Sequence, residues 1–74
     1  MTPAAAIDAA LAAAGIATKQ ERAKVVGEYA THWGRYVAGG RHPQTSKVQR
    51  WLECCAVAGH PVRLRWDTAG ARVV

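Results

Sequence analysis

Three polar residues near the middle of the chain, Thr31, His32 and Arg35, have side chains that could bond to the edges of DNA bases. An arginine guanidinium can bond bidentately to O6 and N7 of guanine. A threonine hydroxyl can donate, accept or touch a thymine methyl group, and a histidine can bond to an acceptor on a purine. The same residues are also compatible with a solvated surface, so their role depends on the elements that position them.

Further polar residues bracket this stretch and could bind phosphate. Lys19 and Gln20 precede it, at the predicted start of a helix whose N-terminus adds its own partial positive charge. Arg41, His42 and Lys47 follow it. Phosphate contacts supply affinity and orientation rather than sequence preference. Each residue alone is equally compatible with a solvated charge, but their arrangement on both sides of one candidate helix favours phosphate contacts.

The composition agrees with a polyanionic partner. The chain has 74 residues and a formal net charge of +5, from ten Lys and Arg against five Asp and Glu. Charge alone does not distinguish DNA from RNA or from an acidic membrane surface. A chain of this length forms one domain and hides only roughly 60% of its unfolded surface. We therefore expect neither a deep enzyme cleft nor a small-molecule substrate.

The sequence favours a reducing compartment. No stretch approaches the roughly 20 apolar residues that span a bilayer, and the start of the chain lacks the pattern of a signal peptide. Cys54 and Cys55 are adjacent in a predicted helix, where their side chains diverge by about 100° and are poorly placed for a disulfide with each other. We expect a cytoplasmic protein that makes no membrane contact.

Capping residues predict two helices in the first third of the chain. Thr2 before a proline predicts a helix over residues 3 to 14, followed by a glycine. Thr18 predicts the start of a second helix, and Glu21 three positions later could complete a capping box. Gly27 predicts the end of that helix, because glycine readily adopts the left-handed conformation that follows many helices.

Apolar spacing predicts two more helices. The third covers residues 30 to 38 and stops before two glycines. Its apolar residues recur at i, i+3 and i+4, at Trp33, Tyr36 and Val37. A loop follows, after which Thr45 or Ser46 could cap a fourth helix that ends near Ala58. The apolar face of that helix consists of Val48, Trp51, Leu52 and Cys55.

The end of the chain switches to the period of a β-strand. Apolar and basic residues alternate in the order Val62, Arg63, Leu64, Arg65 and Trp66. With a turn over residues 67 to 70, this predicts a hairpin over residues 62 to 74. An isolated hairpin is marginal in water, so it should cover the core or extend a sheet across a two-fold axis, with its unpaired edge as a candidate homodimer contact. Whether the two arginines face solvent or DNA stays open.

Residues 19 to 38 have the spacing of a helix-turn-helix. Ala23 is a small residue that would let the second helix approach closely, and Gly27 permits the sharp turn between the two helices. Trp33 and Tyr36 would fix the second helix onto the core, which leaves its other face free to enter the major groove. The predicted fold is mostly α, a single domain of four helices with a C-terminal β-hairpin.

The segment KQERAKVVGEYATHWGRYVAGG, followed by RHP and an amphipathic helix, resembles the Cro and lambda-repressor-like helix-turn-helix domains, also called the Xre family. The resemblance covers residues 15 to 64 and implies a lambda-repressor-like domain. It further implies a transcriptional regulator that binds double-stranded DNA sequence-specifically. We expect a small repressor that binds a palindromic operator as a homodimer, although dimerisation follows from the C-terminal strands and not from the resemblance. Three positions depart from the family pattern: Lys19 replaces the usual glutamine, Arg22 the usual leucine, and Tyr29 a Ser or Thr cap.

Other classes of function find less support. The main alternative is a protein-interaction module on the same scaffold, such as a phage- or plasmid-type inhibitor or an antitoxin, and binding to structured RNA is a weaker one. The cysteines and histidines lack the spacing of a zinc site, and no glycine loop has the sequence that cradles phosphate. Ser46, His42 and Glu53 could form a hydrolytic set on paper, but nothing predicts their convergence. We expect no catalytic residue, no metal and no cofactor.

Overall fold

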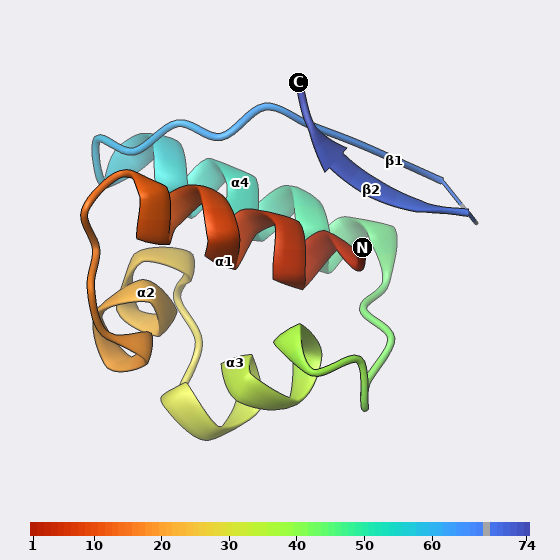
Figure 1. Cartoon of the computed structure of the whole chain (residues 1–74), viewed down its shortest axis with the longest axis horizontal. Helices are drawn as coiled ribbons and strands as arrows, with labels where there is room; N and C mark the ends of the chain where they lie inside the picture. The colour runs from red at the N-terminus through yellow and green to blue at the C-terminus, as the bar shows by residue number, and fades with distance from the viewer. Residues whose placement is uncertain (68) are drawn as a thin grey trace.

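The computed structural model describes residues 1–67 and 69–74 and shows a mostly helical domain that ends in a two-stranded antiparallel hairpin (Figure 1). Its elements are, in order, α1 (Pro3–Ala13), α2 (Lys19–Val26), α3 (Ala30–Val37), α4 (Thr45–Val57), β1 (Leu64–Asp67) and β2 (Gly70–Val73). The predicted order of helices and strands is confirmed. The predicted turn includes Thr68, which lies outside the described residues.

The first two helices begin and end through the local signals that predicted them. The Thr2 hydroxyl accepts a hydrogen bond of 3.1 Å from the amide of Ala5, and the Thr18 hydroxyl accepts one of 3.2 Å from the amide of Glu21. These bonds satisfy amides that have no partner within the helix. Gly27 follows α2 with a φ of 82°, a conformation that costs glycine little.

The start of α4 differs from the prediction. Its N-cap is Gln44, whose extended backbone has φ −70° and ψ 155°, so the predicted capping by Thr45 or Ser46 is wrong. Proline disfavours the helical conformation at the residue before it, which here is His42. It does not restrict the residues after Gln44, so the helix can begin at Thr45. The Gln44 carbonyl accepts hydrogen bonds from the amides of Lys47 and Val48.

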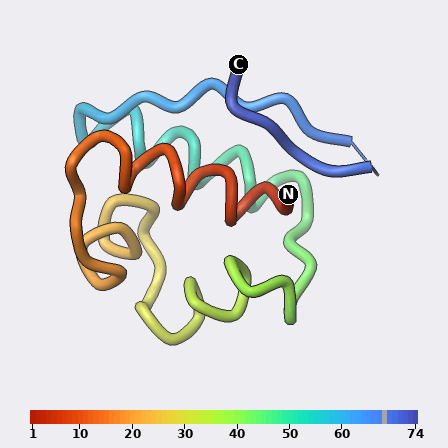
Figure 2. The backbone as a smooth tube through the Cα atoms, in the orientation of Figure 1, coloured from red at the N-terminus to blue at the C-terminus, as the bar shows by residue number. Residues whose placement is uncertain are grey.

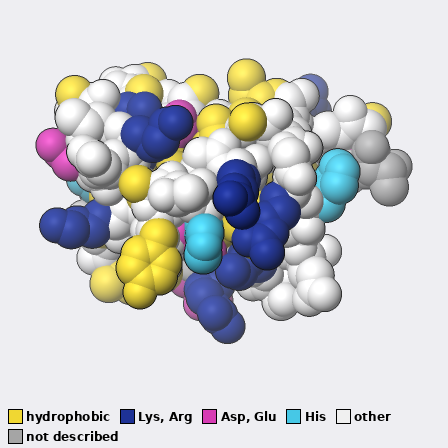
Figure 3. Space-filling model, turned by 90° about the horizontal axis from the view of Figure 1, so that it is seen from below, with side chains coloured by type: hydrophobic (Ala, Val, Ile, Leu, Met, Phe, Trp, Pro, Cys, Tyr) yellow, Lys and Arg dark blue, Asp and Glu magenta, His cyan; other side chains and the backbone are white. Residues whose placement is uncertain are grey.

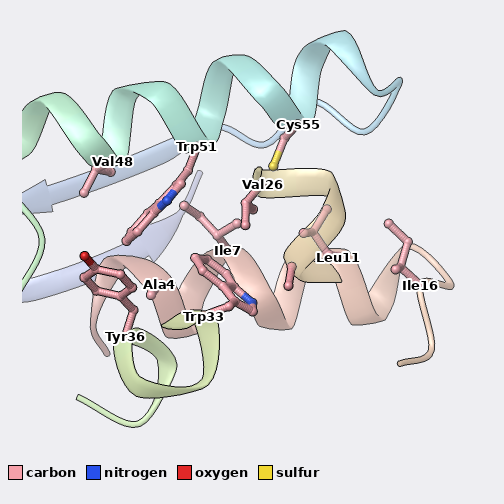
Figure 4. Close-up of a cluster of buried hydrophobic side chains, with 11 residues drawn as sticks. Ala4, Ile7, Leu11, Ile16, Val26, Trp33, Tyr36, Val48, Trp51 and Cys55 are labelled. Atoms are coloured by element: carbon pink, nitrogen blue, oxygen red, sulfur yellow. The ribbon is translucent and has the colours of Figure 1, made fainter. Parts of the chain in front are cut away.

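Two tryptophans from different helices form the centre of the core. Trp33 of α3 and Trp51 of α4 are both fully buried and meet edge to face, with ring centroids 5.0 Å apart (Figure 4). Tyr36 packs against Trp51 in the same way at 4.9 Å. Such edge-to-face contacts suit the charge distribution of aromatic rings. From α1, Ile7 and Leu11 close the cluster with no exposed surface.

The hairpin covers one side of this core. Leu64 and Trp66 are partly buried and pack against the core cluster, whereas Arg63 and Arg65 are exposed, which confirms the predicted alternation. The helix α1 contacts both the hairpin and α3, and it runs between them in the tube view (Figure 2). The hairpin and α3 therefore lie on different sides of α1.

Candidate nucleic-acid interface

The carboxylate of Asp8 ties α3 to the first two helices. Its Oδ1 accepts a hydrogen bond from the indole Nε1 of Trp33 and an ion-paired bond from Nε of Arg22, both at 2.8 Å. The guanidinium of Arg22 also donates to the carbonyls of Ile16 and Ala17, at 2.8 and 3.0 Å. Arg22, which stands where the resembled family has leucine, therefore ties α2 to α1 and to the segment between them, while Asp8 links both helices to α3.

The carboxylate of Glu28 connects the segment between α2 and α3 to α4. Its Oε2 accepts a hydrogen bond of 2.9 Å from Nε1 of Trp51 and lies 3.1 Å from Nζ of Lys47. Burial acts to raise the pKa of Glu28, but the hydrogen bonds from Trp51 and Lys47 and the charge of Lys47 outweigh it, so the pKa is lowered. The middle of α3 is thus held to α1 through Trp33 and Asp8, and the segment that precedes α3 is held to α4 through Glu28.

The face of α3 that points away from the core carries the three residues predicted to contact bases. Thr31, His32 and Arg35 are all exposed, while Trp33 and Tyr36 on the other face are buried. This orientation follows from the helical period, because residues three or four positions apart share a face. Thr31 and His32 therefore share a face with Arg35, and Trp33 shares the other with Tyr36. The three side chains are available to a partner, and their contact with bases stays a prediction.

Lys19 joins this exposed face from α2. A Cβ atom on Gly34 would lie 3.4 Å from Nζ of Lys19, so the ammonium group lies directly over the glycine. Lys19, Thr31 and Arg35 line one shallow groove along α3. Gln20 lies apart from this groove and lines a second hollow with Tyr29. The structure therefore brings Lys19, but not Gln20, next to the predicted base-reading residues.

The predicted phosphate contacts beyond α3 gather around Tyr36. The guanidinium carbon of Arg41 and Nζ of Lys47 lie 5.7 and 5.6 Å from the centroid of the Tyr36 ring, within the range of cation–π attraction. His42 and Lys47 line one hollow together with Arg50. Lys47 already shares its charge with Glu28, so less of it is free for a phosphate than Arg41 offers.

Two residues that the sequence reasoning did not select belong to this surface. Arg50 lines the same hollow as Lys47, and its position three residues later on one helix could have revealed it. Tyr29 is 80% exposed and lies edge to face against His32, with ring centroids 5.8 Å apart. Its exposure could not be read from the sequence, because an aromatic residue before a helix usually indicates a core contact.

The resulting face is basic. Seen from the side on which α2 and α3 lie, lysine, arginine and histidine side chains gather across the middle of the surface, with few acidic ones among them (Figure 3). Asp8 and Glu28, the two carboxylates nearest to α3, are mostly buried and already paired. Among the described residues, no ion pair joins Lys19, Arg35 or Arg41 to a carboxylate, so the charges of these three residues are left for a partner.

The two cysteines are free thiols. Cys55 is buried, and burial, with a smaller effect of the neighbouring Cys54, raises its pKa to about 11. A thiol with so high a pKa is a poor nucleophile and a poor metal ligand at neutral pH. Within residues 1–67 and 69–74, no three His, Cys, Asp or Glu side chains are grouped closely enough to hold a metal ion. Over the same residues, no helix is long and apolar enough to cross a membrane.

Comparison of the chain with protein-family models, with curated proteins and with solved structures found no match.

Proposed function

We propose that the protein is a sequence-specific double-stranded DNA-binding regulator of transcription, a small cytoplasmic repressor in which α2 and α3 form a helix-turn-helix. One observation carries the proposal: α3 presents Thr31, His32 and Arg35 to solvent while its opposite face is locked into the core by Trp33 and Tyr36. A recognition helix needs this combination, because base edges are read by side chains held in a fixed orientation.

The joint between α2 and α3 supports this proposal. Ala23 is 1% exposed and belongs to the core cluster, and α2 and α3 contact each other. Gly27 makes the left-handed turn that leads from one helix to the other. The short connection keeps α3 at a steep angle to α2 (Figure 1). An exposed helix held in this way can enter a major groove about 12 Å wide.

Basic and polar residues on both sides of α3 supply the phosphate contacts in this proposal. Lys19 and Gln20 at the start of α2 would contact the backbone on one side of the groove, and Arg41, His42 and Lys47 would contact it on the other. Because these contacts neutralise phosphates whatever the sequence, they set the affinity and its salt dependence. Selection among sequences would come from α3.

The proposed repressor acts as a homodimer through the C-terminal strands. The outer edge of β2 is partly occupied, since the amide of Ala71 donates a hydrogen bond of 2.6 Å to the carbonyl of Met1. The outer edge of β1 is therefore the better candidate for pairing with a second copy. A symmetric dimer would place two α3 helices on half-sites about one helical turn, roughly 34 Å, apart.

Selection of bound fragments from a pool of random duplexes tests the proposal. We expect a palindromic site to be enriched, and its affinity to fall steeply with salt concentration. R35A should lose the preference at one base of each half-site, whereas R65A, which removes the same charge from the hairpin, should keep the selected sequence. Equal binding of every duplex by the unmodified protein would overturn the proposal.

A further inference from the structure

The outer face of the hairpin carries three arginines that the proposed recognition surface does not use. Arg63, Arg65 and Arg72 are all exposed, and Arg65 and Arg72 are direct partners across the two strands. The amide of Val74 donates to the carbonyl of Arg63, so by the alternation of an antiparallel ladder Arg65 and Arg72 form a hydrogen-bonded pair. The three side chains thus stand on one face of the sheet.

This face bears charge that the protein itself does not neutralise. Directly opposed residues of a sheet have Cβ atoms about 4.5–5.5 Å apart, where like charges repel and destabilise the pairing. Among the described residues, no ion pair joins any of the three arginines to a carboxylate. Asp67 lies on the same face, where its carboxylate can offset one of the three positive charges, and its Oδ1 accepts a hydrogen bond from the amide of Ala69. An arrangement that costs stability in the free protein becomes favourable when an anion binds.

The hairpin arginines cannot contact a straight duplex that is bound at α3. Leu64 and Trp66 face the core, so the arginines on the other side of the sheet point away from it. The helix α1 separates the hairpin from α3 (Figures 1 and 2), and the molecule measures 28 × 25 × 20 Å. A duplex bound at α3 therefore leaves the hairpin face free for a second ligand.

The chemistry of the face points to phosphate. All three cations are arginines, whose planar guanidinium binds phosphate oxygens through two parallel hydrogen bonds. Arg63 and Arg65 are two residues apart on an extended chain, which spaces them by about 6.6 Å along the strand. Three closely spaced guanidinium groups on a narrow two-stranded ribbon suit neighbouring phosphates of a nucleic-acid backbone.

We propose that the outer face of the hairpin, formed by Arg63, Arg65 and Arg72, is a second nucleic-acid-binding site that holds a phosphate backbone without reading sequence. Together with α3 it lets one protein molecule hold two duplex segments at once. The holding of two segments rests on the proposed function of α3, whereas phosphate binding by the hairpin does not.

A bridging experiment tests this site. The protein is loaded onto an immobilised duplex, and a labelled second duplex of random sequence is then titrated at several salt concentrations. We expect capture of the second duplex, with a salt dependence that corresponds to about 0.9 counterions for each of up to three phosphate contacts. The variant R63T/R65T/R72T introduces threonine, which favours strands. It should load normally onto the immobilised duplex but capture the second duplex at least tenfold more weakly. The variant R63K/R65K/R72K should retain most of the capture.

The outcomes separate this site from the recognition helix. Unchanged capture by R63T/R65T/R72T would overturn the proposal, and so would capture of acidic polypeptides in preference to the duplex. If R63T/R65T/R72T lost capture and was also a monomer in solution, the proposal would be overturned as well. The two duplexes would then have been held by the two α3 helices of a dimer. The variant T31A/R35A tests the proposed function separately: its sequence preference should vanish, while capture of the second duplex should still depend on the hairpin arginines.

Discussion

The indole Nε1 of Trp33 lies 2.8 Å from Oδ1 of Asp8, and the same oxygen lies 2.8 Å from Nε of Arg22. One carboxylate oxygen thus neutralises a cation from α2 and satisfies the buried indole of α3. Arg22 and Asp8 are mostly buried, with 14% and 19% of their side chains exposed. The orientation of the proposed recognition helix therefore depends on a residue in α1 that lies far from the exposed face.

Replacing Asp8 should lower the free energy of unfolding. In D8A the indole of Trp33 and the guanidinium of Arg22 lose their shared acceptor, and the loss of a hydrogen bond to a charged group costs about 1.5–3 kcal/mol. We expect the free energy of unfolding in urea to fall by about that amount. E53A removes an exposed carboxylate from α4 and should change the free energy by no more than about 0.5 kcal/mol. Equal effects of the two variants would contradict the structural role of Asp8.

Glu28 should make stability depend on pH in the acid range. Its pKa in the folded protein is lower than the usual 4.5, so the folded state favours the ionised form more than the unfolded state does. The stability from this group is fully present above pH 4.5 and is lost as the pH falls through the lower folded pKa. Urea unfolding between about pH 2 and pH 7 should show this loss, and E28Q should show a smaller one. Parallel pH profiles for the two proteins would show that Glu28 contributes nothing.

Two glycines with similar backbones allow conformational strain to be separated from packing. Gly15 and Gly27 have φ values of 96° and 82°, but a Cβ on Gly15 would meet no atom within 4 Å, whereas one on Gly27 would lie 3.4 Å from Sγ of Cys54. G15A should cost about 1–2 kcal/mol from the left-handed backbone alone. G27A should cost at least as much, because its methyl group would also lie against Sγ of Cys54 with little room to spare. Thermal and urea unfolding of both variants measure the difference, and a smaller loss in G27A would contradict the close packing of α2 on α4.

The sequence predicted what depends on neighbours along the chain. Helix ends marked by Thr2, Thr18 and Gly27 were confirmed, because a cap is made by residues three or four positions apart. The exposed side of α3 and the alternation in the hairpin followed from periodicity. These features place the candidate site on one face.

The roles of Asp8 and Glu28 lay beyond such reasoning. Asp8 meets Trp33 across 25 positions of sequence, and Glu28 meets Trp51 across 23, so no local pattern announces either contact. Lys47 was predicted as a phosphate contact, and its bond to Glu28 came from the same long-range packing. A cation near the start of a helix can both pair with a carboxylate of the protein and face a ligand. Only the three-dimensional arrangement shows that it does both.

Arg35 and Lys47 should therefore respond differently to removal. R35A should lose about 1–3 kcal/mol of discrimination at one base position and leave the free energy of unfolding nearly unchanged, since Arg35 is exposed on α3. K47A should weaken binding to every duplex about equally and lower the salt dependence by about one counterion. Because Lys47 is also paired with Glu28, K47A should destabilise the fold by up to about 1 kcal/mol, which R41A should not. Binding titrations on matched and mismatched duplexes, with urea unfolding of each variant, measure both effects. A change of base preference in K47A, or none in R35A, would reverse the roles assigned to these two residues.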